Sequence, residues 1–364
     1  MSAPQELELY LLGTGTSSAV PSIGCLTSVE KGCYCCRSTL SPSDPDGKYN
    51  IRRNTGAVLR IPSEKAGGRT KSLVIDCGKT FWSAAMEHWP KKGLREIDAL
   101  LITHPHATFP YLTDIAKATG GGDVPALTWN IIDDSAPFYI LGVRIVPLPV
   151  HHGKFFSKPP TPYYCLGFLF ASRLVYLSDV SDIPQPVWEI LERECELPAE
   201  WRPIEDGMAK VEINGVNEGR KGKPKIQGLV VDCLRIEGHM SHFGLGQAIE
   251  AARRIGAERT YLVGFGHMIS HASWVHSMKA FQANATTSLP VLPTVRAPKP
   301  KHLWQHFSGT PVAGQEDKEV FKDYALQGIE SWEGGAKGGF WVRPAADGMT
   351  IKFGGEKCRD DLYQ

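Results

Sequence analysis

The stretch IDALLITHPHA, residues 97–107, begins as an apolar run and ends in two histidines one residue apart. The apolar part has the composition of a buried strand. Because side chains alternate with a period of two in extended chain, His104 and His106 point to the same side and can reach one metal ion. Two loop histidines are more often solvated than bound to a metal, so this pattern needs support elsewhere in the chain.

The same arrangement, an apolar strand followed at once by His or Asp, recurs three times downstream. Residues 143–150 lead into His151 and His152, residues 173–178 into Asp179, and residues 259–266 into His267. In α/β proteins, ligands bind outside the carboxyl ends of the strands. Imidazoles and a carboxylate at these strand ends therefore predict the metal site of a hydrolase.

Several short motifs, taken in order along the chain, resemble those of the metallo-β-lactamase fold superfamily. The likeness is to its phosphodiesterase branch, which includes the cyclic phosphodiesterase of phosphonate breakdown and the tRNA 3′-processing endonucleases. The motifs are Leu12-Gly13-Thr14-Gly15-Thr16, Thr103-His104-Pro105-His106, His152-Gly153, Leu177-Ser178-Asp179-Val180-Ser181, Ser241-His242-Phe243-Gly244-Leu245-Gly246-Gln247-Ala248 and Gly264-Phe265-Gly266-His267.

The resemblance spans nearly the whole chain and implies an α/β fold. It would be a four-layer αββα sandwich of two mixed sheets, with the metal site at one edge. We expect a single domain over residues 1–364, with a polar excursion near residues 199–225 and a Pro-rich insertion near residues 287–335.

The resemblance also implies which residues hold metal at the active site. Of the adjacent pair His151 and His152, the family pattern selects His152, which directly precedes a glycine. Asp179 would bridge two metals, since a carboxylate offers two oxygens. Zinc or manganese suits this mixture of imidazole and carboxylate. The first ion would take His104, His106, His152 and Asp179, and the second Asp179 and His267.

Residues 245–255 carry apolar side chains at helical spacing and are followed by Gly256, which predicts a helix that stops there. Ser241 is a candidate cap for this helix. By resemblance, His242 faces the metal site as the proton donor to the leaving oxygen. Imidazole fits that role because its ordinary pKa lies near neutrality.

Cys25, Cys33, Cys35 and Cys36 lie in a turn-rich loop, and two thiolates spaced as Cys33 and Cys36 can chelate one zinc ion. The resemblance implies a structural zinc held by Cys25, Cys33, Cys36 and His271. The choice between Cys35 and Cys36 stays open, as does the alternative that all are ordinary reduced thiols.

The chain departs from the family pattern directly after Ala107. Where relatives carry an Asp that binds the second metal, this chain has Thr108 and Phe109, which are poor or impossible ligands. The segment from Phe109 to Pro125 is similar to a later part of fungal-type relatives, which indicates an internal deletion. A natural deletion and an incorrectly joined gene model both explain it. With Asp179 and His267 alone, we expect an impaired second metal site.

The composition is that of an ordinary globular protein, with 42% apolar and 22% charged residues. A net charge of +1 offers no broad basic field, so we expect no nucleic-acid partner. The amino terminus lacks an apolar export signal, and nine cysteines are an odd number. These features predict a cytoplasmic protein that is not bound to a membrane, whose cysteines are thiols or metal ligands.

Together these observations favour a metal-dependent hydrolase of small phosphodiesters that uses a metal-activated water as nucleophile. His242 and Asp179 are its candidate catalytic residues. Two alternatives remain: an endonuclease of the tRNA 3′-processing type, which the near-neutral charge disfavours, and a non-catalytic remnant of the fold. The sequence leaves a homodimer open.

Overall fold

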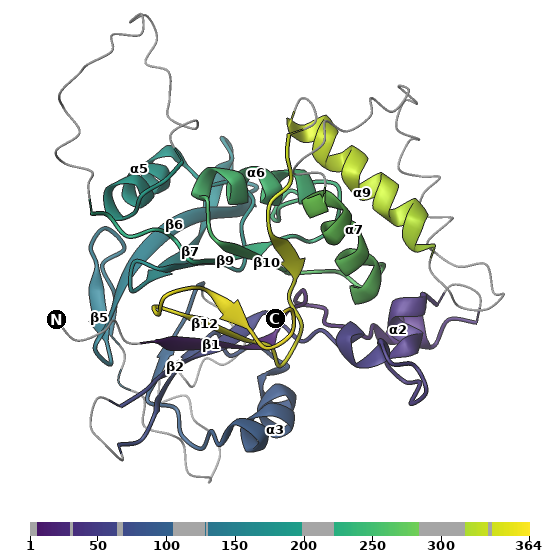
Figure 1. The fold of residues 1–364 in the computed structure, drawn as a ribbon, viewed down its shortest axis with the longest axis horizontal. Coiled ribbons are helices and arrows are strands. Elements are labelled where there is room, and N and C mark those ends of the chain that lie inside the picture. The colour runs from purple at the N-terminus through teal and green to yellow at the C-terminus, as the bar shows by residue number, and fades with distance from the viewer. Residues whose placement is uncertain are drawn as a thin grey trace, which may run out of the picture.

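The computed structural model describes residues 6–29, 32–63, 68–104, 128, 130–198, 222–283, 317–333 and 337–364. These residues form two sheets that lie face to face, with helices on both outer faces (Figure 1). The predicted αββα sandwich of two mixed sheets is therefore confirmed.

The first sheet has six strands in the order β13-β12-β1-β2-β3-β4. Only β3 and β4 run parallel, and the other neighbours are antiparallel. The strands are β1 Leu7–Gly13, β2 Gly56–Ile61, β3 Lys71–Ile75, β4 Ala99–Leu101, β12 Thr350–Phe353 and β13 Arg359–Asp360. The strand predicted within residues 97–107 is thus β4, which is shorter than expected.

The second sheet has seven strands in the order β11-β10-β9-β8-β7-β6-β5. Strands β8 to β11 are parallel, so their carboxyl ends share one edge, whereas β5 to β8 are antiparallel. The strands are β5 Phe138–Ile140, β6 Val143–Phe155, β7 Thr161–Phe170, β8 Leu174–Leu177, β9 Gly228–Asp232, β10 Arg259–Val263 and β11 Val342–Pro344.

Four helices cover the outer face of the second sheet: α5 Gln185–Glu194, α6 Leu245–Ile255, α7 His271–Ala283 and α9 Lys318–Glu333. Helix α3, Phe81–Lys92, covers the first sheet. The short helices α1 Ile23–Leu26 and α2 Tyr34–Ser38 and the 3₁₀ turn η1 Gly47–Asn50 lie together at one end. Helix α9 lies within the stretch that was expected to be a Pro-rich insertion. It packs onto the core through a buried apolar face that includes Phe321, Ala325 and Ile329.

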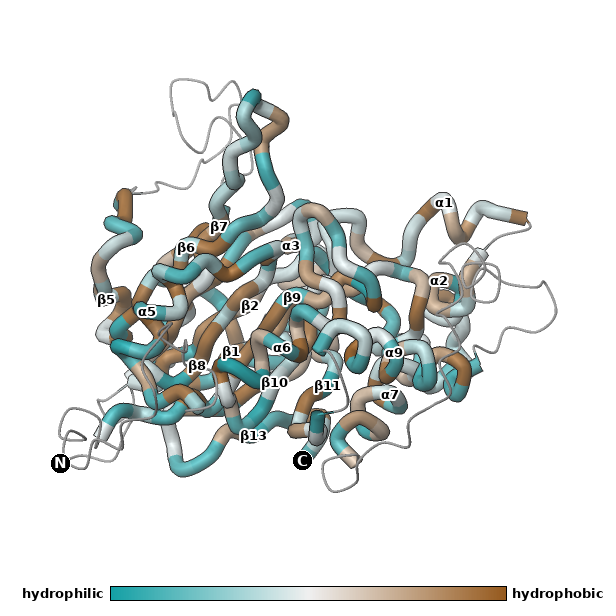
Figure 2. The backbone as a smooth tube through the Cα atoms, turned by 90° about the horizontal axis from the view of Figure 1, so that it is seen from above, coloured by the Kyte–Doolittle hydropathy of each residue, from teal (hydrophilic) through white to brown (hydrophobic). Residues whose placement is uncertain are grey.

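The core has two main parts, and Figure 2 shows the apolar strands at the centre of the molecule. Leu9, Phe168 and Tyr261 belong to a buried cluster between the two sheets. A second cluster lies between the seven-stranded sheet and its helices and includes Leu229 and Trp274. Side chains that alternate along each strand serve the two clusters in turn, which is why the strands of the second sheet are buried on both faces.

Strand β6 is longer than predicted. The apolar run predicted a strand that ends before His151, but pairing with β7 continues as far as Phe155 opposite Thr161. The register shifts between His151 and Lys154, and Gly153 adopts a φ of +82° there, a conformation that glycine accepts without strain. His152 is therefore held within a strand, in an irregularity of its pairing.

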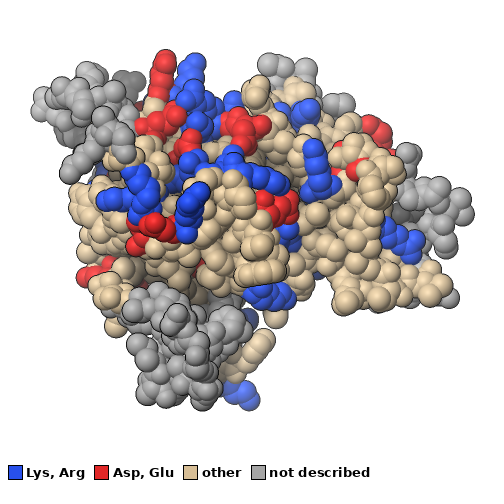
Figure 3. Space-filling view, turned by 90° about the horizontal axis from the view of Figure 1, so that it is seen from below, with Lys and Arg blue, Asp and Glu red and all other residues tan. Residues whose placement is uncertain are grey.

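Basic and acidic side chains are interspersed on the face seen in Figure 3, in keeping with the net charge of +1. Many charged side chains of the described residues form ion pairs, such as Arg60 and Lys352 with Glu8. Among the residues that the structure describes, no helix is both long and apolar enough to cross a bilayer.

Candidate metal centre

Three predicted metal ligands meet at one edge of the sandwich. His104 follows β4, His152 lies in β6 and Asp179 follows β8. The rings of His104 and His152 have centroids 5.4 Å apart. Candidate ligand atoms of His152, Asp179 and His242 all lie within 4.8 Å of one another. The strand-end pattern in the sequence therefore corresponds to one cluster in space, whereas His106 lies outside the described residues.

Cys165 is a member of this cluster that the sequence analysis missed. It lies buried in β7, directly opposite Val150 of β6, and its Sγ is 3.5 Å from Nδ1 of His104. Candidate ligand atoms of His104, Cys165 and Asp179 also lie within 4.8 Å of one another. Burial, with a smaller contribution from the Asp179 charge, raises the pKa of this thiol. The signal for Cys165 was its place in β7, the strand that pairs with β6, which carries His152.

The imidazole of His104 is oriented through Thr103. The backbone N–H and the hydroxyl of Thr103 donate to the Asp76 carboxylate at 2.9 and 2.8 Å. Because that hydroxyl donates its proton to the hydrogen bond with Asp76, its oxygen can accept from Nδ1 of His104, which lies 2.9 Å away. Nε2 is then the nitrogen of His104 that would bind a metal. Asp76 thus accepts hydrogen bonds from the turn that follows β4.

Asp76 itself is buried and strained. Its φ is +58°, a conformation that residues other than glycine rarely adopt. Burial, together with the charge of Asp179, raises the pKa of its carboxyl to about 7. Strain and a buried carboxyl of this kind concentrate at functional sites.

His152 is held by a backbone carbonyl. Its Nδ1 lies 2.7 Å from the carbonyl oxygen of Ser241, which can only accept a hydrogen bond. Nδ1 therefore carries the proton, and Nε2 is the nitrogen available to a metal. The contact also ties strand β6 to the loop that carries His242.

His242 is paired with Asp232, a carboxylate at the end of β9 that the sequence analysis did not include in the site. The Nδ1 of His242 lies 2.7 Å from Oδ2 of Asp232. Although burial opposes it, the hydrogen bond to Asp232 raises the pKa of His242. Burial raises the pKa of Asp232 to about 7. Residues 228–232 form an apolar strand that ends in a carboxylate, the same signal that identified Asp179.

The three cysteines predicted to hold zinc come together, with a different histidine from the one expected. Candidate ligand atoms of Cys25, Cys33, Cys36 and His267 lie within 4.8 Å of one another. Nδ1 of His267 is 3.5 Å from Sγ of Cys33, and Cys25 Sγ is 3.3 Å from Cys33 Sγ. Three thiols and one imidazole are a donor set typical of structural zinc. This grouping selects Cys36 over Cys35.

His267 was expected at the second active-site metal, and the structure corrects that placement. Beyond β10, the guanidinium of Arg52 donates to the backbone carbonyls of Gly266 and Ile269 on both sides of His267. Arg52 is itself buried and pairs with Val20 in the segment next to the cysteines. The turn that carries His267 is therefore held against the cysteine loop.

His271 was expected beside the cysteines, and the structure places it elsewhere. Its buried ring stacks on Tyr49, with centroids 5.5 Å apart, and its Nε2 lies 2.9 Å from the Tyr363 hydroxyl. That hydroxyl donates to the Pro344 carbonyl, so Nε2 carries a proton and donates to Tyr363. Burial lowers the pKa of His271 to about 3. His271 is thus a neutral packing residue.

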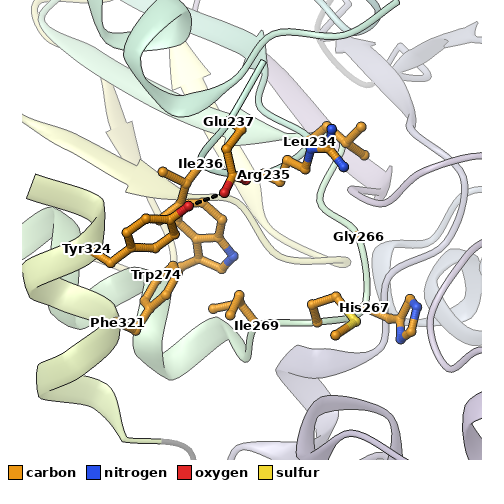
Figure 4. Close-up of a pocket in the computed structure, with 11 residues that line it drawn as sticks. Leu234, Arg235, Ile236, Glu237, Gly266, His267, Ile269, Trp274, Phe321 and Tyr324 are labelled. Atoms are coloured by element: carbon orange, nitrogen blue, oxygen red, sulfur yellow. Dashed lines mark hydrogen bonds between the residues drawn. The ribbon is translucent and has the colours of Figure 1, made fainter. Parts of the chain in front are cut away.

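A cavity of about 190 Å³ has His267 in its lining (Figure 4). Trp274, Phe321 and Ile269 give it an apolar lining, and the hydroxyl of Tyr324 donates to Glu237 at its rim. The histidines of the β4 and β6 site are absent from its lining.

The chain is similar to several known proteins. A family model described as a beta-lactamase superfamily domain matches residues 108–265. A diphosphatase from the PhnP family resembles the chain with a TM-score of 0.52 and 20% identity, over 96% of this chain and 97% of that one. At this identity the likeness shows a shared fold. The metallo-beta-lactamase fold protein YhfI of Bacillus subtilis has a TM-score of 0.46 and 12% identity, over 96% of this chain and all (100%) of that one.

One curated protein, an octanoyltransferase of Porphyromonas gingivalis, is 23% identical over 298 residues. The match covers 72% of this chain and 46% of that protein. The chain therefore spans less than half the length of this relative.

Proposed function

Because the chain has the metallo-β-lactamase fold and carries a beta-lactamase superfamily domain, we propose that it is a metal-dependent hydrolase of small phosphodiesters. The observation that carries the proposal is the convergence of His104, His152, Asp179 and His242 at one edge of the sandwich. A divalent ion held there would supply Lewis acidity toward the phosphoryl group and toward water.

The hydrogen bonds of these residues indicate which atom of each would bind the ion. His104 and His152 present Nε2 because Thr103 and the Ser241 carbonyl engage their Nδ1 atoms. Asp179 supplies the negative charge that a divalent ion requires. These three residues, with His106 as a predicted fourth, would hold the ion.

His242 would act as the proton donor to the leaving oxygen. Asp232 holds Nδ1 of His242 and favours the protonated imidazole, so Nε2–H is free to point at the substrate. This is the arrangement that general acid catalysis by imidazole needs: an oriented ring with a charge partner behind it. Imidazolium also offsets the negative charge of a phosphodiester.

We propose a single active-site ion. His267, which would have contributed to a second ion, lies with the cysteines, and position 108, where the family resemblance implies an Asp, holds Thr. Zinc or manganese would fit the active site, and zinc would fit the cysteine cluster of Cys25, Cys33, Cys36 and His267. None of the nine cysteines forms a disulfide, which supports a reducing, cytoplasmic compartment.

Hydrolysis of bis(p-nitrophenyl) phosphate tests the proposal, measured with metal-free protein and after addition of zinc or manganese. We expect metal-dependent turnover that falls by about 10²-fold or more in His152→Ala and in His242→Asn. Circular dichroism of each variant would exclude unfolding as the cause. Absence of turnover with either metal would favour the non-catalytic alternative, and cleavage of a precursor tRNA would favour the endonuclease.

A further inference from the structure

The hairpin that joins β6 and β7 extends beyond the body of the molecule (Figure 2). We refer to its residues 154–164 as the aromatic arm; their sequence is KFFSKPPTPYY. The arm contains four aromatic residues, two lysines and no acidic residue. This composition is unusual for the exposed end of a hairpin, where polar turn residues are common.

The aromatic arm is joined to the active site by ring contacts. The ring of Tyr163 lies 6.5 Å from that of His104 and 6.0 Å from that of His152, measured between centroids. On its other side, Tyr163 meets Phe155 edge to face at 5.2 Å. A path of aromatic surface therefore runs from the candidate metal ligands to the arm.

The other three rings of the arm are exposed. Phe155 is 53% exposed, Phe156 85% and Tyr164 56%. Met240, at 65%, is exposed on the loop that carries His242, and its carbonyl approaches Gly153 at the base of the arm. Several large apolar side chains exposed together beside a catalytic site mark a surface that binds something.

The charge of the arm indicates what that partner carries. Lys154 and Lys158 are exposed, and in the described residues no ion pair is found for either. A flat aromatic surface flanked by ammonium groups favours a ligand with a planar ring and an anionic group over an aliphatic chain, which gains nothing from the lysines.

We propose that the aromatic arm binds the planar ring of a phosphate ester whose phosphate lies at the metal centre. This rests on the proposed function, and it makes aryl or nucleoside phosphates the preferred substrate class. A ring bound at the exposed Phe155 and Phe156 would place its phosphate on the side of Tyr163, whose ring contacts Phe155, His104 and His152.

Binding can be measured apart from catalysis by titration calorimetry. Adenosine 5′-monophosphate and ribose 5-phosphate share a phosphate and a sugar, and the first alone has a base. Stacking of one base is worth about 1–3 kcal/mol, so we expect adenosine 5′-monophosphate to bind about 5- to 150-fold more tightly. Phe156→Ala should abolish the difference, whereas Tyr139→Ala, at a residue 69% exposed on the edge strand β5, should retain it.

Equal affinity for the two ligands, or a difference that survives in Phe156→Ala, would overturn the proposal. Phenyl phosphate separates the two sources of a ring: binding as tight as that of the nucleotide indicates any aryl group, and weaker binding indicates a nucleobase. A wild-type dimer that Phe156→Ala dissociates without changing nucleotide affinity would show that the arm contacts a second copy instead.

Turnover distinguishes this proposal from the proposed function. The p-nitrophenyl esters of methyl phosphate and of thymidine 5′-phosphate release the same leaving group, so the ratio of their kcat/KM values reports on the other substituent. We expect Phe156→Ala to lower the kcat/KM of the thymidine ester relative to that of the methyl ester, by raising the KM for the thymidine ester. If neither ester is hydrolysed but the binding difference stands, the hydrolase assignment fails while the ring-binding role of the arm is retained.

Discussion

Oδ2 of Asp232 lies 2.7 Å from Nδ1 of His242, and the same oxygen accepts from the backbone N–H of Val180, directly after Asp179. One buried carboxylate thus fixes the candidate proton donor and the residue next to a candidate metal ligand. It couples the ends of β8 and β9 at the centre of the site.

Asp232→Asn should lower turnover of a phosphodiester by about 10²-fold or more, because an amide neither favours the imidazolium of His242 nor fixes its tautomer. The double variant Asp232→Asn/His242→Asn should be no slower than His242→Asn alone, since the two residues act as a unit. Kinetics of the three variants measure this, and additive losses would show that Asp232 acts independently of His242.

Metal analysis should distinguish the roles of His267, which the structure places at the cysteine cluster, and His271, which was expected there from the sequence. We expect about one zinc ion per chain at the cysteine cluster, lost in Cys33→Ser and in His267→Ala and retained in His271→Gln. Loss of this ion from His271→Gln but not from His267→Ala would restore the assignment made from sequence. His152→Ala should leave this zinc in place.

Gly264→Ala should destabilise the protein more than Gly93→Ala. Both glycines have positive φ, +81° and +63°, and an alanine there costs about 1–2 kcal/mol. A Cβ on Gly264 would lie 2.2 Å from Oδ1 of Asp232, whereas a Cβ on Gly93 meets nothing within 4 Å. Urea unfolding of both variants measures the difference, and equal losses would contradict the close approach of Gly264 to Asp232.

Acid should destabilise the native state partly through His271. Burial lowers its pKa from 6.5 to about 3, so between these values the unfolded chain binds a proton that the native state does not. The free energy of unfolding should therefore fall as the pH drops below 6.5, by at most about 1.4 kcal/mol per pH unit.

His271→Gln should flatten this part of the stability curve, measured by urea unfolding between pH 7 and pH 4. His276→Gln, at a partly buried histidine of the same helix α7, is the matched control and should leave the slope unchanged. A slope that persists in His271→Gln would assign the acid sensitivity to other groups.

Local patterns predicted much of this architecture. Helix α6 has the predicted bounds, and Gly256 ends it in the left-handed conformation that was expected there. Its cap was predicted less well: Gly244 occupies the cap position, where its N–H donates to the Gln247 side chain, and Ser241 instead accepts from His152 through its carbonyl. A helix face depends on spacing along the chain, but the contacts of a cap depend on where the preceding loop is held.

By itself, the sequence determined which segments form strands and that their ends carry His104, His152 and Asp179, because side-chain period and composition are local properties. Only the tertiary structure decided which strand ends meet. Arg52 holds the turn that carries His267 against the cysteine loop, Asp232 accepts from the backbone N–H of Val180 beyond β8, and Cys165 lies beside His104 where the N–H of Leu166 donates to the Thr103 carbonyl. Each of these contacts joins residues distant in the chain, so their proximity depends on how the sheets and loops pack.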